Sequence, residues 1–456
     1  MLVFISDLHY RDEEAFTVSP HMTEGFVKKS LVPQVQDAQA NEVTVVFLGD
    51  LLDINRSRLW VDGVSGGYKP WSHWKQTLAA LRSDPSKGDS AFDPSRFEQT
   101  ILQILDGIKG ASETSYQWWQ KFKSLDPSVW GNGGFRPQKV SFQFVPGNHD
   151  RLAQYSPTVH QRVSDHLSLD RDKASAPFDW IGIYPEYSVI ALHGHLFDSS
   201  NYGGGKTFPD NPLVSPWYHY PSLGDVVTVT FGVELAHRFA QIPRVALNPG
   251  LVPSIAEIDL VRPQTSAMRW LAKWQLTQDR SIASALDEIV VGLIAQFMRE
   301  QFVKEWLGWF LKFLYSVGVV RPKNVEQAFG LFDRLGGGAT STKDYETSMV
   351  KATASGPFAG WVRENYPEMR YVITGHTHRP CVVSLSGDAG KDVKNERLYF
   401  NTGTWLDMLE EGRSAQGGFA RRQQITHVTF YKEGEDRKPN QRRSYWEFWQ
   451  GNLREG

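Results

Sequence analysis

The sequence predicts an α/β fold, because short apolar runs with the composition of buried strands recur along the chain and end in polar turns. The clearest run is Val43–Leu48, after which Gly49 allows a sharp turn and Asp50 follows. Such a run is typical of a strand buried on both faces, in a sheet that helices cover. Four further runs precede comparable polar turns, at Leu2–Ile5, Val140–Val145, Tyr187–Leu192 and Met369–Thr374.

The length of the chain predicts more than one compact unit. Its 456 residues exceed what a single hydrophobic core usually holds, and strand-like runs are sparse in two long segments. We therefore predict one core that is interrupted twice. The predicted core comprises 1–55, 140–195 and 368–456, and the two predicted insertions, mainly helical, are 56–139 and 196–367. Closing strands are predicted at Cys381–Leu385, Leu398–Phe400 and Ile425–Tyr431.

Composition and charge are those of an ordinary globular protein. Hydrophobic residues make up 41% and charged residues 22% of the chain, and a formal net charge of -2 gives no electrostatic footprint for nucleic acid. The single cysteine, Cys381, excludes an internal disulfide and favours a reducing, cytoplasmic setting. We expect no removable leader, since Leu2–Ile5 is already a strand. We also expect no transmembrane segment, since a run of ~20 uninterrupted apolar residues does not occur.

Side chains that bind metals follow the predicted strands. They come directly after the strand ends, which is where ligands bind in open α/β sheets. These candidates are Asp7, His9, Asp50, Asn148, His193, His376 and His378. Each turn alone is equally typical of loop or capping chemistry, and only the recurrence of the pattern favours a metal site. Asp53, three residues after Asp50, is expected to support the site rather than to bind an ion.

The donor set predicts two divalent metal ions. Imidazole nitrogens with carboxylate and amide oxygens, and no cysteine, suit Mn²⁺, Fe or Zn²⁺, of which we expect Mn²⁺ first. Seven ligands are too many for one ion and suit two that lie ~3.5–4 Å apart. His149 follows Asn148 and is expected to face the same crevice. Asp150 is expected to hold the other nitrogen of that imidazole.

The second insertion contains the clearest helical patterns. Ile289–Met298 and Phe302–Val317 each combine a broad apolar face with a narrow polar stripe. The apolar face of the latter comprises Phe302, Trp306, Trp309, Phe310, Phe313, Leu314 and Val317. The favoured interpretation is a pair of mostly buried helices that pack together. The alternatives are a cap that holds apolar ligand groups, a dimer face, and a contact with a membrane surface.

In this order, the five polar turns resemble the motifs of calcineurin-like metallophosphoesterases. The matching stretches are Asp-Leu-His at 7–9, Gly-Asp-Leu-Leu-Asp at 49–53, Gly-Asn-His-Asp at 147–150, His-Gly-His at 193–195 and Gly-His-Thr-His at 375–378. The resemblance covers the core at both ends and in the middle, and neither insertion. It implies a four-layer αββα sandwich of two mixed β-sheets with a dinuclear metal site at its rim.

The resemblance also implies a role for each site residue. It assigns the first ion to Asp7, His9, Asp50 and His378, and the second ion to Asp50, Asn148, His193 and His376. Asp50 belongs to both sets and would bridge the ions. His149, oriented by Asp150, would stabilise the transition state or protonate the leaving oxygen. The implied activity is hydrolysis of a phosphomonoester or phosphodiester by a hydroxide that bridges the metals.

The chain resembles particular branches of the family less completely than it resembles the family as a whole. The opening Ile-Ser-Asp-Leu-His and closing Gly-His-Thr-His-Arg-Pro resemble bacterial UDP-diacylglucosamine hydrolases, which usually carry Arg where this chain has His149. Protein Ser/Thr phosphatases typically end the third motif in Glu, where this chain has Asp150. DNA-repair nucleases share Gly-Asn-His-Asp, but the near-neutral charge gives no support for a duplex-binding face. We expect a small-molecule, nucleotide or lipid-linked phosphoester as the substrate, with a DNA or RNA nuclease as the alternative. A catalytically silent scaffold is a further alternative, although this chain retains the whole ligand set.

Overall fold

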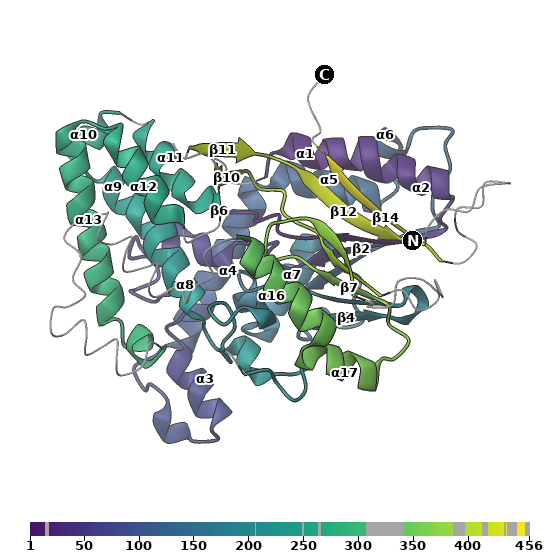
Figure 1. The fold of residues 1–456 in the computed structure, drawn as a ribbon, viewed down its shortest axis with the longest axis horizontal. Helices are drawn as coiled ribbons and strands as arrows, with labels where there is room; N and C mark the ends of the chain where they lie inside the picture. The colour runs from purple at the N-terminus through teal and green to yellow at the C-terminus, as the bar shows by residue number, and fades with distance from the viewer. Residues whose placement is uncertain are drawn as a thin grey trace.

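The fold is that of a computed structural model, which describes residues 1–13, 18–205, 207–248, 250–262, 266–306, 342–385, 397–412, 418–432, 435 and 445–451 (Figure 1). Within these residues the chain forms an α/β protein with three mixed sheets of five, five and three strands, none of them closed. The predicted α/β class is confirmed. The prediction of two sheets is corrected to three.

The first sheet has the strand order β14-β12-β1-β2-β3. Its strands are β1 (Leu2–Ile5), β2 (Glu42–Leu48), β3 (Lys139–Val145), β12 (Ile425–Phe430) and β14 (Trp446–Gly451). The three strands β1, β2 and β3 run parallel, so that Val45 lies opposite Val3 on one side and Phe142 on the other. Their carboxyl ends therefore reach one edge of the sheet, where three of the polar turns follow.

The second sheet has the strand order β4-β5-β7-β9-β8. Its strands are β4 (Ile181–Tyr184), β5 (Val189–Leu192), β7 (Tyr371–Thr374), β8 (Cys381–Ser384) and β9 (Leu398–Asn401). The central strands β5, β7 and β9 are parallel, and the remaining two polar turns follow β5 and β7. β5 and β7 each begin two residues later than the sequence predicts.

Helices connect the strands and cover the sheets (Figure 1). The described α-helices are α1 (Pro20–Phe26), α2 (Val32–Ala38), α3 (Trp74–Leu81), α4 (Pro94–Ala111), α5 (Glu113–Lys123), α6 (Pro127–Trp130), α7 (Pro157–Leu167), α8 (Leu223–Val227), α9 (Leu235–Ala240), α10 (Pro243–Ala246), α11 (Leu251–Ala256), α12 (Ala267–Leu276), α13 (Arg280–Arg299), α16 (Thr342–Ser355) and α17 (Pro357–Asn365). Adjacent parallel strands need a crossover. The segment between β2 and β3 therefore includes, in α5, a helix that packs on the first sheet.

The two five-stranded sheets pack face to face through a shared apolar cluster. It joins side chains of the first sheet, such as Phe4, to side chains of the second, such as Ile373. The other face of the first sheet packs through Phe47 into the main core with the helices, and the other face of the second sheet contacts Phe358 of α17. Burial on both faces explains why the strands appear in the sequence as uninterrupted apolar runs.

The third sheet, with the order β11-β10-β6, ties the second insertion to the core. Its strands are β6 (Val261–Arg262), β10 (Met408–Glu411) and β11 (Phe419–Arg422). β6 pairs in parallel with β10, which places Arg262 opposite Glu410. A two-residue strand that ends in a charged residue shows no apolar periodicity, and this is why the sequence does not predict it.

The second insertion is helical over much of its described length. The predicted helix at Ile289–Met298 lies within α13, whose inner face, including Leu293, is buried. Phe302 is buried in the same core and Trp306, partly buried, packs against it. The other residues of the predicted apolar face, from Trp309 to Val317, lie outside the described residues. Among the described helices, α13 is long and apolar enough to cross a membrane, but core helices of soluble proteins meet the same criterion.

Candidate metal centre

The polar turns meet where the carboxyl ends of the two sheets lie side by side. The Asp7 amide donates to the Gly49 carbonyl at 3.0 Å, which continues the pairing of β1 and β2 beyond the strands. The Gly375 amide donates to the His193 carbonyl at 2.9 Å and joins the turns of β5 and β7 in the same way. The His376 amide donates to Asp7 Oδ2 at 3.1 Å, so the turns of the two sheets are bonded to each other.

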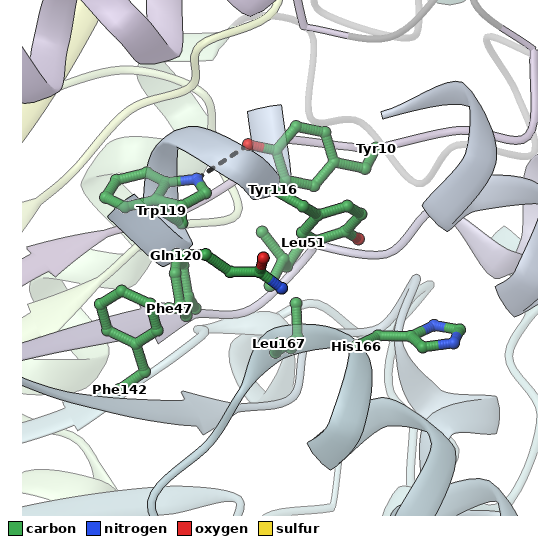
Figure 2. Close-up of a pocket in the computed structure, with 9 residues that line it drawn as sticks. All are labelled: Tyr10, Phe47, Leu51, Tyr116, Trp119, Gln120, Phe142, His166 and Leu167. Atoms are coloured by element: carbon green, nitrogen blue, oxygen red, sulfur yellow. Dashed lines mark hydrogen bonds between the residues drawn. The ribbon is translucent and has the colours of Figure 1, made fainter. Parts of the chain in front are cut away.

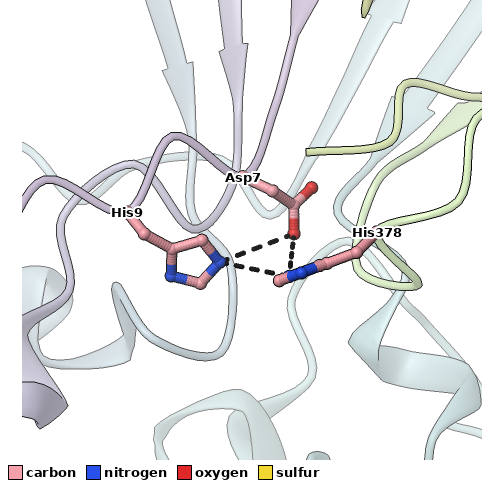
Figure 3. Close-up of side chains that lie close together, drawn as sticks. All are labelled: Asp7, His9 and His378. Carbon is pink, nitrogen blue, oxygen red and sulfur yellow. Dashed lines mark hydrogen bonds and ion pairs between the residues drawn. The ribbon is translucent and has the colours of Figure 1, made fainter. Parts of the chain in front are cut away.

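Asp7, His9 and His378 form one buried cluster that could hold a metal ion (Figure 3). Nε2 of His378 lies 3.2 Å from both Asp7 Oδ1 and His9 Nε2. Nε2 of His9 lies 3.9 Å from Asp7 Oδ1. An ion with bonds of about 2.0–2.2 Å could reach all three atoms of this triangle.

Asp50, His193 and His376 form a second cluster of the same kind. Oδ2 of Asp50 lies 3.1 Å from His193 Nε2 and 3.9 Å from His9 Nε2, which belongs to the first cluster. Asp50 thus stands between the two clusters, as a bridging carboxylate would. His9, Asp50 and His149 form a third, overlapping cluster, so His149 is also within reach of an ion.

Two buried polar atoms show that the site suits a cation. The side-chain amide of Asn148 donates to Asn201 Oδ1 at 3.4 Å, which leaves Asn148 Oδ1 buried without a hydrogen-bond partner. His193 Nε2, which faces Asp50 Oδ2 at 3.1 Å, is likewise buried without a hydrogen-bond partner among the described residues. Buried polar atoms without a partner are costly unless something binds them. Adjacent His/Asp clusters here could hold one or two metal ions.

The backbone at the site is in a conformation that most residues avoid. Within the described part of the chain, five of the ten non-glycine residues with positive φ are predicted ligands, with φ between 49° and 70°. They are Asp7, His9, Asp50, His376 and His378. Gly49, at φ 77°, is required for a further reason, because a Cβ there would overlap the imidazole of His193. Backbone strain of this kind clusters at functional sites, where the surrounding structure over-determines it.

Three of the four imidazoles that are predicted ligands have a hydrogen-bond acceptor behind them. Nδ1 of His193 faces the Leu48 carbonyl at 3.2 Å, and Nδ1 of His9 faces Asp53 Oδ2 at 3.2 Å. Nε2 of His376 faces Asp198 Oδ2 at 3.0 Å, which leaves Nδ1 as the nitrogen available to an ion. Acceptors in these positions hold a proton on the outer nitrogen and turn the lone pair of the other toward a metal.

Asp53, and not Asp150, holds the imidazole of His149. His149 Nδ1 lies 2.6 Å from Asp53 Oδ1. Asp150 instead accepts hydrogen bonds from backbone amides, among them Leu52 N at 2.6 Å and Gly147 N at 2.9 Å. The predicted orienting role of Asp150 is therefore corrected. The turn after Asn148 folds this carboxylate back onto the loop that follows β2, where unpaired backbone amides need an acceptor.

A buried ionic network from the second insertion adjoins the first cluster. Asp53 pairs with Arg56 at 2.8 Å and with Arg11 at 3.2 Å, and Asp259 pairs with the same two guanidiniums at 2.7 Å each. Arg262 Nε donates to His378 Nδ1 at 3.2 Å. No sequence motif marks Asp198, Asp259 or Arg262, because each meets the site only through the folding of a long connection.

Charge within the site is strongly coupled. Burial by itself would raise the pKa of Asp50, but the imidazoles of His193 and His149 hold that pKa well below its usual value. Burial would lower the pKa of His193, but Asp50 and Asp7 raise it to about 9. Burial raises the pKa of Asp7 to about 6 and lowers that of His9 to about 4. An ion bound by Nε2 of His193 would therefore have to displace the proton of that imidazole.

One cavity close to these turns is too small for a substrate. It lies behind the site, between Tyr10, which follows His9, and α5, and is lined mainly by aromatic side chains (Figure 2). Its volume of about 10 Å³ holds at most a single water molecule. Tyr116 Oη is buried there without a hydrogen-bond partner among the described residues, and such a water would satisfy it.

No protein-family model matches the chain, and no curated protein matches its sequence. The buried His/Asp clusters and the mixed α/β fold around them therefore carry the functional assignment on their own.

Proposed function

We propose that this protein is a phosphoester hydrolase of the calcineurin-like type that uses two divalent metal ions. The observation that carries the proposal is the pair of buried His/Asp clusters that share Asp50 at the edge where both sheets end. Two divalent ions so placed polarise a phosphoryl group and activate water at neutral pH. Two sheets packed face to face, with helices on their outer sides, support the αββα arrangement expected for this family.

The ligand assignment follows from the two clusters. Asp7, His9, Asp50 and His378 would hold the first ion, and Asp50, Asn148, His193 and His376 the second. Nitrogen and oxygen donors without a thiolate favour Mn²⁺, with Fe or Zn²⁺ as alternatives. We assign this enzyme to the cytoplasm, in keeping with its one free cysteine.

His149 is proposed as the proton donor to the leaving oxygen. Its Nδ1 is held by Asp53 at 2.6 Å, so Nε2 is the nitrogen free to face a substrate. Burial would lower the pKa of His149, but Asp53 and Asp50 raise it, which favours the protonated imidazole near neutral pH. A positioned acid of this kind typically contributes 10²–10⁴-fold to the rate.

Substrate selection is proposed to belong to the second insertion. Asp259 and Arg262 extend from it to within hydrogen-bond distance of Arg11, Arg56 and His378 beside the first cluster. An insertion in this position can form a wall of the substrate site. We propose a small-molecule, nucleotide or lipid-linked phosphoester as its substrate.

Metal analysis combined with a substrate panel tests the proposal. The purified full chain, reloaded with Mn²⁺, should hold two ions and hydrolyse phosphomonoester or phosphodiester model substrates. The panel includes p-nitrophenyl phosphate, bis(p-nitrophenyl) phosphate, nucleotide-linked lipids, and single- and double-stranded DNA. Degradation of DNA in preference to the small esters would assign a nuclease instead. A chain that binds no ion and hydrolyses none of these compounds would refute the proposal.

A further inference from the structure

One of the four proposed ligand imidazoles has a donor, and no acceptor among the described residues, behind it. His193 and His376 each face an acceptor through the nitrogen that points away from the proposed ions. Nδ1 of His9 faces Asp53 Oδ2 at 3.2 Å, although Nη1 of Arg56 also lies 3.4 Å from it. His378 instead faces Nε of Arg262 at 3.2 Å. This contact is buried, and Arg262 itself is only 8% exposed, so water is largely excluded as a substitute partner.

The two contacts of His378 make conflicting demands on one ring. Its Nε2 lies at the corner of the first cluster, 3.2 Å from Asp7 Oδ1 and from His9 Nε2. A neutral imidazole that binds an ion through Nε2 carries its proton on Nδ1 and needs an acceptor there. A guanidinium has only donors. When Arg262 donates to Nδ1, the proton of the neutral ring is therefore on Nε2, where it blocks the ion.

The surrounding charges act in the same direction. Three buried guanidiniums, those of Arg11, Arg56 and Arg262, lie beside the first cluster. Two carboxylates, those of Asp53 and Asp259, lie among them. Nη1 of Arg262 also donates to the backbone carbonyls of Asp259 at 2.8 Å and Val261 at 2.9 Å. Three guanidiniums against two carboxylates leave one excess positive charge beside the first cluster, and this charge opposes entry of a cation there.

We propose that Arg262, which the insertion supplies through β6, competes with the first metal ion for His378. The two ion positions then differ in affinity. The position at Asp50, Asn148, His193 and His376 fills first, and the position at Asp7, His9 and His378 fills only when Arg262 leaves Nδ1 of His378. Arg262 is thus a positioning residue that sets metal loading. This inference depends on the proposed two-ion site.

Calorimetric titration of the metal-free full chain with Zn²⁺ tests the proposal without any assay of activity. The wild type should show two binding events whose Kd values differ by about tenfold or more, the usual effect of a partner behind a metal-bound histidine. His378→Ala should abolish the weaker event and keep the tighter one. Arg262→Gln offers Nδ1 an amide acceptor in place of the guanidinium. It should tighten the weaker event by about tenfold and leave the other within about twofold.

Two further measurements separate the effect of Arg262 on metal binding from a general loss of structure in the variants. Arg162→Gln, which removes a guanidinium paired with Asp106 on the surface, should leave both events unchanged. In wild-type protein labelled with ¹⁵N-histidine, the His378 signals should show the proton on Nε2 without metal and on Nδ1 after the second equivalent of Zn²⁺. This readout requires no variant to fold.

Different outcomes refute different claims. If the wild type binds no Zn²⁺, the proposed two-ion site is wrong. If two ions bind with equal affinity, or if Arg262→Gln leaves the weaker event unchanged or weakens it, the site stands and the role of Arg262 is wrong. A proton on Nδ1 of His378 before metal is added would overturn the competition directly.

Discussion

Asp53→Asn is the substitution that best tests how the site is organised. In the structure one carboxylate serves four groups, His149 at 2.6 Å through Oδ1, and His9, Arg11 and Arg56 at 2.8–3.2 Å through Oδ2. Asparagine keeps the shape of the side chain. It loses the charge and turns an NH₂ group toward groups that themselves donate hydrogen bonds.

The expected magnitudes follow from these contacts. Removing one partner from a buried ionic cluster usually costs roughly 3–5 kcal/mol of stability. Because Asp259 still pairs with Arg11 and Arg56 at 2.7 Å, the lower end of that range is expected. Loss of the acceptor behind His9 should weaken metal binding by about 10–100-fold. Loss of the hydrogen bond that orients His149 should reduce turnover by roughly 10²–10⁴-fold at saturating metal.

The pH profile of turnover gives the decisive readout. His149 acts when protonated, so the rate falls as pH rises through its pKa. Asp53 helps to raise that pKa, and its removal should shift this alkaline limb to lower pH. Asp150→Asn is the matched control. Asp150 is as buried as Asp53 and is adjacent to His149 in sequence, but its carboxylate accepts hydrogen bonds from backbone amides. The alkaline limb of the pH profile should therefore not move in Asp150→Asn. A shift in Asp150→Asn and none in Asp53→Asn would refute the reasoning.

Three further predictions concern the ions and the proton donor. Asp50→Asn should lower both metal content and turnover severely, because both clusters use this carboxylate; two retained ions with near-normal turnover, by elemental analysis and rate measurement, would contradict it. His149→Ala should retain both ions and lose roughly 10²–10⁴-fold in rate, whereas loss of an ion would make His149 a ligand. Affinity for Mn²⁺ should rise from pH 6 to 9, because the pKa of His193 is raised to about 9 and its proton must leave. Titrations in buffers of different ionisation enthalpy should detect that proton, and its absence would contradict the coupling of His193 to Asp50.

The sequence by itself was sufficient to single out the ligand candidates, for a local reason. Each follows a strand within one to four residues, and parallel strands bring their carboxyl ends to a common edge whatever the connections between them do. The α/β class followed from the same apolar runs. Six of the seven candidates fall into the buried clusters, and Asn148 lies beside them with an unpaired oxygen.

Only the tertiary structure decided which groups stand behind those ligands. Asp150 is adjacent to His149 in sequence, yet the turn directs its carboxylate to backbone amides. The imidazole of His149 instead pairs with Asp53, which follows the neighbouring strand β2. Asp198 and Arg262 lie in the long connection between β5 and β7 and reach His376 and His378 by its path through space. The periodicity of a sequence reports which residues are buried along one element. The partner of a buried side chain comes from another element, and that choice is made by packing.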